Sequence, residues 1–339
     1  MRLWLGSILG SVAITAAVGV GMVIVVGATY HPDLVVPAGV NGHCMRVQGE
    51  LMRVRQGGEG PDVLLIHGGT GSIEDWQPVW DALTRRYRVT AYDRPGMGYS
   101  DARPDDATVA GNARGAEALV NALDLRDVLV VGHGYGATIA LALAESGRLD
   151  ARGYVLLAPR VYPSDAWIPT RANRLLAEPV VGEGLARLAG PFTAPSSIER
   201  RLQREADPAL PPYPSNFVTL RQRLWSRPLP LATRARQRLH MNADLTRVAS
   251  RLDAVQAPVV LLTGNADSPA LRRQARRLAG AVPRLRSRSL PGVHHYIQFE
   301  APSAVVSAVD RLRAGREPDP PFYSAGSTAV AASETPVPR

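Results

Sequence analysis

The stretch Val128-Leu-Val-Val-Gly-His-Gly-Tyr-Gly-Ala-Thr-Ile-Ala140 decides the fold of this chain. Its first four residues are apolar and have the length of a buried strand, and an Ala-rich helical pattern begins at Tyr135. Only Gly132-His133-Gly134 separates the two, which leaves no room for an ordinary loop. Small residues around a central position let a strand run directly into a helix through a strained turn. The turn lifts its central residue, here Gly134, above the edge of the sheet.

Short apolar runs and helical patterns alternate on both sides of this turn. Buried apolar strands that alternate with helices indicate βαβ units and a mostly parallel sheet, so the sequence predicts an α/β fold. Two short strands joined by a Gly turn are expected over residues 44–58. The other expected strands are 63–66, 87–92, 128–131, 154–157, 259–263 and 286–290, and the expected helices are 73–86, 107–123, 135–145, one from about 270, and 301–316.

The alternation is interrupted between residues 160 and 255. This stretch is helical, contains several prolines and has 15 Arg against 8 Asp plus Glu. Ligands of open α/β sheets bind beyond the carboxyl ends of the strands, so we expect residues 160–255 to form a helical cap over that edge. The core then consists of two parts, 43–159 and 256–316. Residues 317–339 are rich in Pro, Ser, Ala and Thr, which is typical of a disordered tail.

The N-terminal segment differs in kind from the rest. Residues 3–29 carry no charge, and about 20 such residues span a bilayer core. We therefore predict a transmembrane anchor over 1–29 and a Pro- and Gly-containing linker over 30–42. A signal peptide cleaved after Ala28 is the alternative, but the apolar run exceeds the roughly 7–15 residues of an ordinary signal-peptide core. Arg2 precedes the span and no Arg follows it before Arg46, which favours a cytoplasmic N-terminus and an exported soluble domain.

The composition is basic, with a formal net charge of +9, and all 39 basic residues are Arg. GC-rich coding accounts for the absence of Lys, and a basic surface suits a domain close to anionic lipid headgroups. The arginines are scattered, with no basic helix and no aromatic-basic motif, so nucleic acid is not expected as a partner. The only cysteine is Cys44, which excludes an intrachain disulfide. No spacing of Cys, His and Asp indicates a metal site, and no cofactor is expected.

Four motifs resemble those of the α/β-hydrolase superfamily, in particular its capped esterases and epoxide-hydrolase-like members, and together they cover about residues 44–316. His67-Gly68-Gly69-Thr70-Gly71 resembles the oxyanion loop, Asp93-Arg94-Pro95-Gly96-Met97-Gly98-Tyr99-Ser100 the turn after the next strand, and Gly132–Gly136 the nucleophile elbow. Gly264-Asn265-Ala266-Asp267 and Pro291-Gly292-Val293-His294-His295 resemble the acid and histidine loops, in the family's order. With the N-terminal span, the resemblance implies a capped α/β-hydrolase domain anchored in a bacterial inner membrane by a single pass, with the domain on the extracytoplasmic side.

The resemblance also assigns roles to individual residues. It makes His295 the general base and Asp267 the carboxylate that orients the imidazole. The backbone N–H groups of Gly69 and Tyr135 would form the oxyanion hole, which needs no side chain at the elbow. His294 stands where the family often has Gly, which leaves open whether the two histidines share the role of base. Three further polar residues of these motifs are expected to be structural: His67, Asp93 and His133.

Gly134 is the departure from the family, whose members have Ser at this nucleophile position, or Asp in epoxide hydrolases and dehalogenases. In one serine hydrolase, loss of the nucleophile lowers the rate by a factor of about 10⁶. The remaining rate is still roughly 10³–10⁴ times that of the uncatalysed reaction in water. One hypothesis is a hydrolase of a small, hydrophobic ester-like or related carbonyl substrate, in which His295 and Asp267 activate water or, alternatively, abstract a proton from the substrate. The other is a catalytically inactive pseudoenzyme that binds a small ligand or a partner at the membrane surface.

Overall fold

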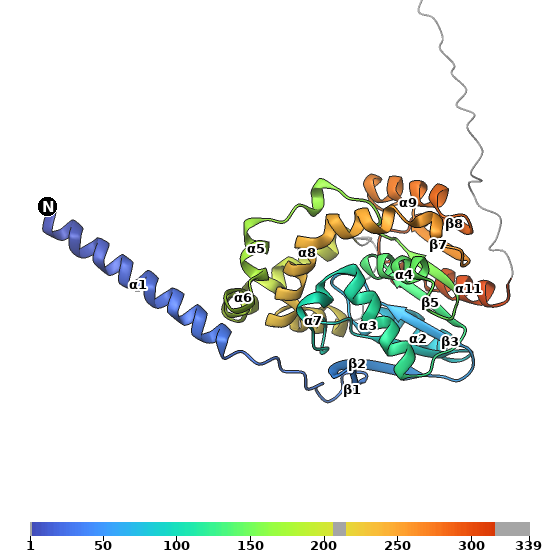
Figure 1. Ribbon diagram of the computed structural model, residues 1–339, viewed down its shortest axis with the longest axis horizontal. Helices are drawn as coiled ribbons and strands as arrows, with labels where there is room; N and C mark the ends of the chain where they lie inside the picture. The colour runs from blue at the N-terminus through green and yellow to red at the C-terminus, as the bar shows by residue number, and fades with distance from the viewer. Residues whose placement is uncertain (1, 206–214, 316–339) are drawn as a thin grey trace, which may run out of the picture.

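A single mixed sheet organises the described part of the chain, residues 2–205 and 215–315 of a computed structural model (Figure 1). The strand order is β1-β2-β4-β3-β5-β6-β7-β8. β1 and β2 form a hairpin, β2 pairs antiparallel with β4, and all remaining pairs are parallel. The strands are β1 (His43–Val47), β2 (Glu50–Gly57), β3 (Asp62–Ile66), β4 (Arg88–Tyr92), β5 (Val128–His133), β6 (Ala151–Leu157), β7 (Val259–Gly264) and β8 (Leu285–Leu290). The predicted α/β fold with a mostly parallel sheet is confirmed.

Helices cover both faces of the sheet. Alternate residues of the strands pack against α3 (Val109–Ala122), α4 (Tyr135–Ser146) and α9 (Pro269–Ala281) on one face. The intervening residues pack against α2 (Gln77–Thr84) and α11 (Pro302–Arg313) on the other. Because both faces are buried, the central strands read as continuous apolar runs in the sequence.

Prolines and caps shift several helix boundaries from those predicted. The pattern over 73–86 folds as a 3₁₀ turn, η1 (Ile73–Trp76), and then α2, which has Pro78 in its first turn, where proline is tolerated. The helix expected from residue 107 begins at Val109, because Thr108 is its N-cap. The Thr108 hydroxyl accepts a hydrogen bond of 2.9 Å from the backbone N–H of Gly111. The helix predicted over 301–316 is α11, which has Pro302 at its start and ends at Arg313, and a short helix that was not predicted, α10 (Ile297–Glu300), precedes it. The predicted tail over 317–339 lies outside the described residues.

Four helices between β6 and β7 form a separate layer over one end of the sheet (Figure 1). They are α5 (Arg171–Ala177), α6 (Pro179–Glu205), α7 (Ser215–Trp225) and α8 (Pro228–Ala249). α8 is the organising element, since it packs against the other three and also against the core helix α4. We refer to α5–α8 as the cap.

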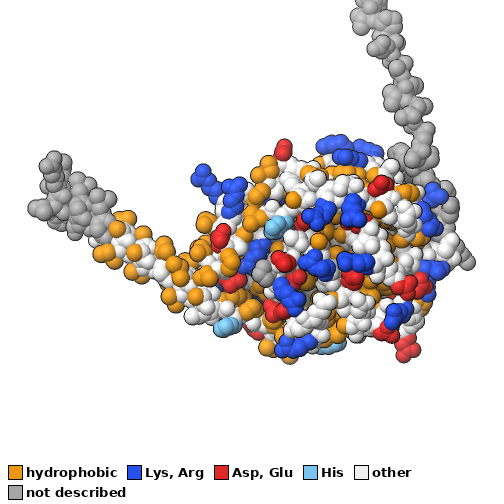
Figure 2. All heavy atoms as spheres, viewed as in Figure 1, with side chains coloured by type: hydrophobic (Ala, Val, Ile, Leu, Met, Phe, Trp, Pro, Cys, Tyr) orange, Lys and Arg blue, Asp and Glu red, His pale blue; other side chains and the backbone are white. Residues whose placement is uncertain are grey.

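The helix α1 (Arg2–Ala28) projects away from the rest of the molecule (Figure 1). Its segment Ser11–Ala28 has a mean hydropathy of 2.3, is 6% buried, and is long and apolar enough to cross a membrane. Hydrophobic side chains cover this part of α1 in Figure 2, whereas charges are spread over the globular part. The same length and composition also fit a signal sequence. Its C-terminal end packs against α6, where Gly27 and Gly184 face the partner helix's backbone too closely for any side chain.

Candidate active site

The turn between β5 and α4 has the backbone of a nucleophile elbow. Gly134 has φ +55° and ψ −111°, a left-handed conformation that favours glycine. A Cβ at Gly132 would collide with the first turn of α4, and one at Gly136 with the carbonyls that end β3, so both flanking positions require glycine. At Gly134 itself there is room, because the nearest heavy atom to an added Cβ would be Nε2 of His295, at 3.6 Å. The site therefore keeps the shape of the elbow and the space for a side chain that points at His295.

His295, which is buried, pairs with the partly buried Asp267 next to this space. Nδ1 of His295 lies 3.2 Å from Oδ2 of Asp267, whose other carboxylate oxygen accepts the Ser268 N–H at 2.7 Å. Nε2 of His295 lies 3.3 Å from a guanidinium nitrogen of Arg160, which can only donate. Both contacts require the tautomer with the proton on Nδ1, so the lone pair of Nε2 faces Gly134 and Arg160. The structure thus brings together the three residues expected at the catalytic positions: Gly134, Asp267 and His295.

His294 has a different carboxylate partner. Its backbone N–H and its Nδ1 lie 2.7 and 3.2 Å from Oε2 of Glu300, which follows in the short helix α10. Glu300 therefore holds the His294 ring, while Asp267 holds the His295 ring. The histidine beside Gly134 is His295.

The two residues expected to form an oxyanion hole, Gly69 and Tyr135, are neighbours in the cavity wall. A Cβ at Gly69 would contact Cβ of Tyr135 at 3.7 Å, and both residues line the cavity wall. Tyr135 is the first residue of α4, and N–H groups in the first turn of a helix have no partner within the helix. The N-terminus of α4 also favours negative charge. Gly69 and Tyr135, the residues expected to supply the oxyanion-hole N–H groups, are therefore neighbours in the wall of the cavity that Gly134 also lines.

The buried residue Arg94 holds the oxyanion loop in position. Its guanidinium donates to the carbonyl oxygens of His67 and Gly68, at 3.2 and 3.0 Å, and to the side chain of Asn112, at 2.8 Å. Its backbone N–H donates to Nε2 of His67 at 2.9 Å, which fixes that ring in the loop. Burial lowers the pKa of His67 well below its usual value, so the ring is neutral. These contacts give His67 the structural position expected for it.

Two other polar residues of the motifs are buried where structural roles predict. Nε2 of His133 donates to the His295 carbonyl oxygen at 3.1 Å and so links the elbow to the histidine loop. Burial lowers the pKa of His133 well below its usual value. The carboxylate of Asp93 accepts the N–H groups of Ile73 and Tyr99, each at 2.9 Å, and pairs with Arg53 at 3.0 Å. Asp93 thereby closes the turn after β4.

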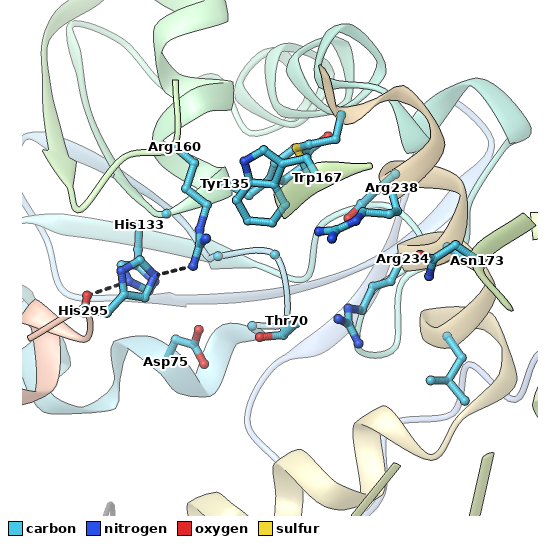
Figure 3. Close-up of a pocket in the computed structure, with 18 of the residues that line it drawn as sticks. Thr70, Asp75, His133, Tyr135, Arg160, Trp167, Asn173, Arg234, Arg238 and His295 are labelled. Carbon is cyan, nitrogen blue, oxygen red and sulfur yellow. Dashed lines mark hydrogen bonds between the residues drawn. The ribbon is translucent and has the colours of Figure 1, made fainter. Parts of the chain in front are cut away.

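The elbow, His295 and the oxyanion loop open into one cavity of about 340 Å³ beneath the cap (Figure 3). Its floor comes from the core, and its far wall comes from Trp167, α5, α7 and α8. Trp167, Leu176, Leu231 and Met241 supply apolar surface. Within residues 2–205 and 215–315, no group of three or more His, Cys, Asp or Glu side chains is arranged to hold a metal ion.

The charged side chains of this cavity are mostly arginines, which sequence analysis did not find. They are Arg160, Arg221, Arg234 and Arg238, with Asp75 as the one acidic residue among the lining side chains. Asp75 forms a buried ion pair with Arg221. Burial raises the pKa of Asp75, and the neighbouring Arg221 opposes that shift. The spacing of Arg234 and Arg238 by four residues was the only sequence signal, and it says nothing about which face of the helix meets the site.

A mostly parallel sheet whose central strand enters a helix through a strained turn, opposite a His–Asp pair and beneath a helical cap, is the architecture of an α/β hydrolase. Residues 63–309, well over half of the chain, match the model of the alpha/beta hydrolase family. The chain belongs to the α/β hydrolase family.

Similar proteins include hydrolases of more than one reaction type. An uncharacterized protein of Mycobacterium tuberculosis is 27% identical over 281 residues, which are 80% of this chain and 81% of that protein. Haloalkane dehalogenase 2 of the same species is 27% identical over 267 residues, 74% of this chain and 87% of the enzyme. The structure of an epoxide hydrolase from Vigna radiata superposes with a TM-score of 0.65 at 24% identity, over 83% of this chain and 100% of that one. That superposition supports the fold.

Proposed function

We propose that this protein is a hydrolase that cleaves an ester or a related carbonyl compound by direct attack of water. The observation that carries the proposal is the position of His295, whose Nε2 lies 3.6 Å from the point where a Cβ at Gly134 would stand. A serine hydroxyl at this position would lie within hydrogen-bonding reach of that nitrogen. A water molecule in the same place has the same access to the base and to the oxyanion donors.

The reaction requires no covalent intermediate. As the water oxygen attacks the carbonyl carbon, Nε2 of His295 takes one of its protons, and Asp267 stabilises the resulting imidazolium. The carbonyl oxygen becomes an oxyanion that accepts hydrogen bonds from the backbone N–H groups of Gly69 and Tyr135. The tetrahedral intermediate then breaks its bond to the leaving oxygen, which takes the proton from His295. The products are a carboxylic acid and an alcohol.

A second function, ligand binding without turnover, is favoured by one contact. The guanidinium of Arg160 lies 3.3 Å from Nε2 of His295 and occupies the lone pair that a general base uses. In a hydrolase, Arg160 has to leave this position when the substrate binds. In a catalytically inactive binding protein it has no need to move.

A panel of p-nitrophenyl and naphthyl esters, screened for both product release and thermal stabilisation, separates the two functions. The hydrolase proposal predicts product release above the buffer rate for at least one ester. Stabilisation by esters or their acids without any product would support the binding protein instead. Neither product nor stabilisation across the panel would count against both.

We further propose that α1 is a retained anchor and that the domain is extracytoplasmic. The support is the 18-residue apolar segment and its flanking charges. The intact mass of the protein extracted from membranes tests retention, since the whole chain has a mass of 36.4 kDa. A product that begins at Thr29 would show a cleaved signal peptide. Activity of an alkaline phosphatase fused after residue 315 reports the side of the membrane.

A further inference from the structure

The cap helix α6 packs across the end of α1. Among residues 11–28, only those in the last two turns of α1 are buried or half-buried. The contact is close, because a Cβ at Gly27 would collide with the carbonyl of Val180. In the same way, a Cβ at Gly184 would collide with the carbonyl of Val23. In Figure 1 α6 is seen end-on beside α1, which runs in the plane of the picture, so the two helices cross steeply.

This crossing fixes the depth of α6 in a membrane that α1 spans. At 1.5 Å per residue, the 18 residues of Ser11–Ala28 cover about 27 Å, close to the roughly 30 Å of a bilayer core. Because α6 contacts the last residues of this segment, it lies where the segment leaves the acyl chains. Tyr30 follows shortly afterwards, and the guanidinium of Arg187 on α6 lies 5.6 Å from the centre of its ring. Tyrosine and arginine are both typical of the membrane interface.

One face of the first half of α6 carries large apolar side chains. Val181, Leu185, Leu188 and Phe192 recur at intervals of four, three and four residues, the spacing that keeps side chains on one side of a helix. The first three are half-buried, and Phe192 is 83% exposed. We refer to these four residues as the apolar stripe.

The apolar stripe lies on a different side of α6 from the contacts with the rest of the cap. A Cβ at Gly182 would collide with the carbonyl of Leu176 in α5. One at Gly190 would meet the side chain of Leu231 in α8. At 3.6 residues per turn, these two glycines face the domain and the stripe faces away from it, whereas Gly184, which meets α1, lies next to the stripe. The stripe therefore continues the surface that α1 begins.

We propose that α6 lies along the surface of the membrane that α1 spans, with the apolar stripe directed into the bilayer. This orientation requires that α1 is retained, as proposed above. Helices that lie in a membrane surface combine an apolar face with basic side chains and bury that face at the boundary of headgroups and acyl chains. Arg187 and Arg200 are exposed on α6 and suit anionic headgroups. Because α8 packs against α6 and also lines the cavity, the candidate active site then lies one helix away from the bilayer.

Fluorescence of the full-length protein in liposomes of phosphatidylcholine and phosphatidylglycerol tests this orientation. Phe192→Cys, in a Cys44→Ser background, carries NBD, a dye that emits at shorter wavelength in apolar surroundings. Arg273→Cys in the same background is the matched control, since Arg273 is exposed on α9, on the far side of the domain from α1 (Figure 1). The label at 192 should emit at shorter wavelength than the label at 273. Phosphatidylcholine with a nitroxide on its acyl chain should also quench it more strongly.

Flotation of the liposomes separates this orientation from the anchor itself. A chain that floats, with equal quenching of the two labels, would show that α1 is an anchor and that α6 does not lie on the membrane. A label at 192 that emits at shorter wavelength without being quenched would show that protein covers the stripe, as in a pair of copies, and would also overturn the proposal. A chain that does not float would remove the anchor and this orientation together. Labelled Leu188→Cys takes the place of Phe192→Cys if that variant does not fold, and ester turnover tests the hydrolase proposal independently.

Discussion

Gly134→Ser is expected to produce a serine hydrolase that reacts through an acyl-enzyme. The substitution places a hydroxyl between His295 and the oxyanion donors, in a space where an added Cβ has no contact closer than 3.6 Å. Loss of the nucleophile lowers kcat by a factor of about 10⁶ in one serine hydrolase. We therefore expect its introduction here to raise kcat on p-nitrophenyl esters by a factor of roughly 10² or more. A serine-directed phosphonate should label residue 134 in the variant, as seen by peptide mass spectrometry.

The variant carries a cost in stability, since φ +55° is strained for any residue with a Cβ, by about 1–3 kcal/mol. Gly134→Ala is therefore the matched control, because it has the same strain and no hydroxyl. It should lose similar stability in thermal unfolding and gain neither activity nor label. A folded Gly134→Ser variant that does not react with the phosphonate would show that the base or the oxyanion hole is not functional.

His295→Ala should remove ester turnover, with a fall in kcat of about 10²–10⁴, the contribution typical of a general base. The His133 side chain contacts the backbone carbonyl at this position, so the substitution keeps the link between the elbow and the histidine loop. His294→Ala is the control, because Glu300 holds His294. It should change kcat less than about threefold. A comparable fall in both variants, or none in His295→Ala, would remove the dyad from the mechanism.

The parts of the fold and site that follow from sequence are those encoded locally. The elbow needs Gly132 and Gly136 because the strand, the helix and the neighbouring strand approach too closely for a Cβ, and this requirement appears in the sequence as a fixed spacing. Asp267 and His295 each follow a strand of the sheet at its carboxyl end, where parallel strands bring their loops together. Their meeting could therefore be expected before any geometry was known.

The electrostatic character of the cavity could not be predicted in this way. Arg160 lies in the loop after β6, whereas Arg234 and Arg238 lie on the cap helix α8. Only the packing of α8 on the core brings these three side chains to the same cavity. The 15 arginines of residues 160–255 look alike in the sequence. The role of Arg94 depends in the same way on tertiary contacts, since its partners lie 18 to 27 residues away.

The measurement that tests direct attack by water most directly follows a single turnover of the unaltered protein, with protein in excess over a p-nitrophenyl ester that it cleaves. Intact-mass spectrometry of quenched samples reports any acyl group left on the chain, while absorbance reports release of p-nitrophenol. We predict that release of p-nitrophenol and of the free acid coincide and that the mass of the protein does not change. An acylated protein that accumulates before the acid appears would reveal a nucleophile elsewhere in the chain and contradict the mechanism.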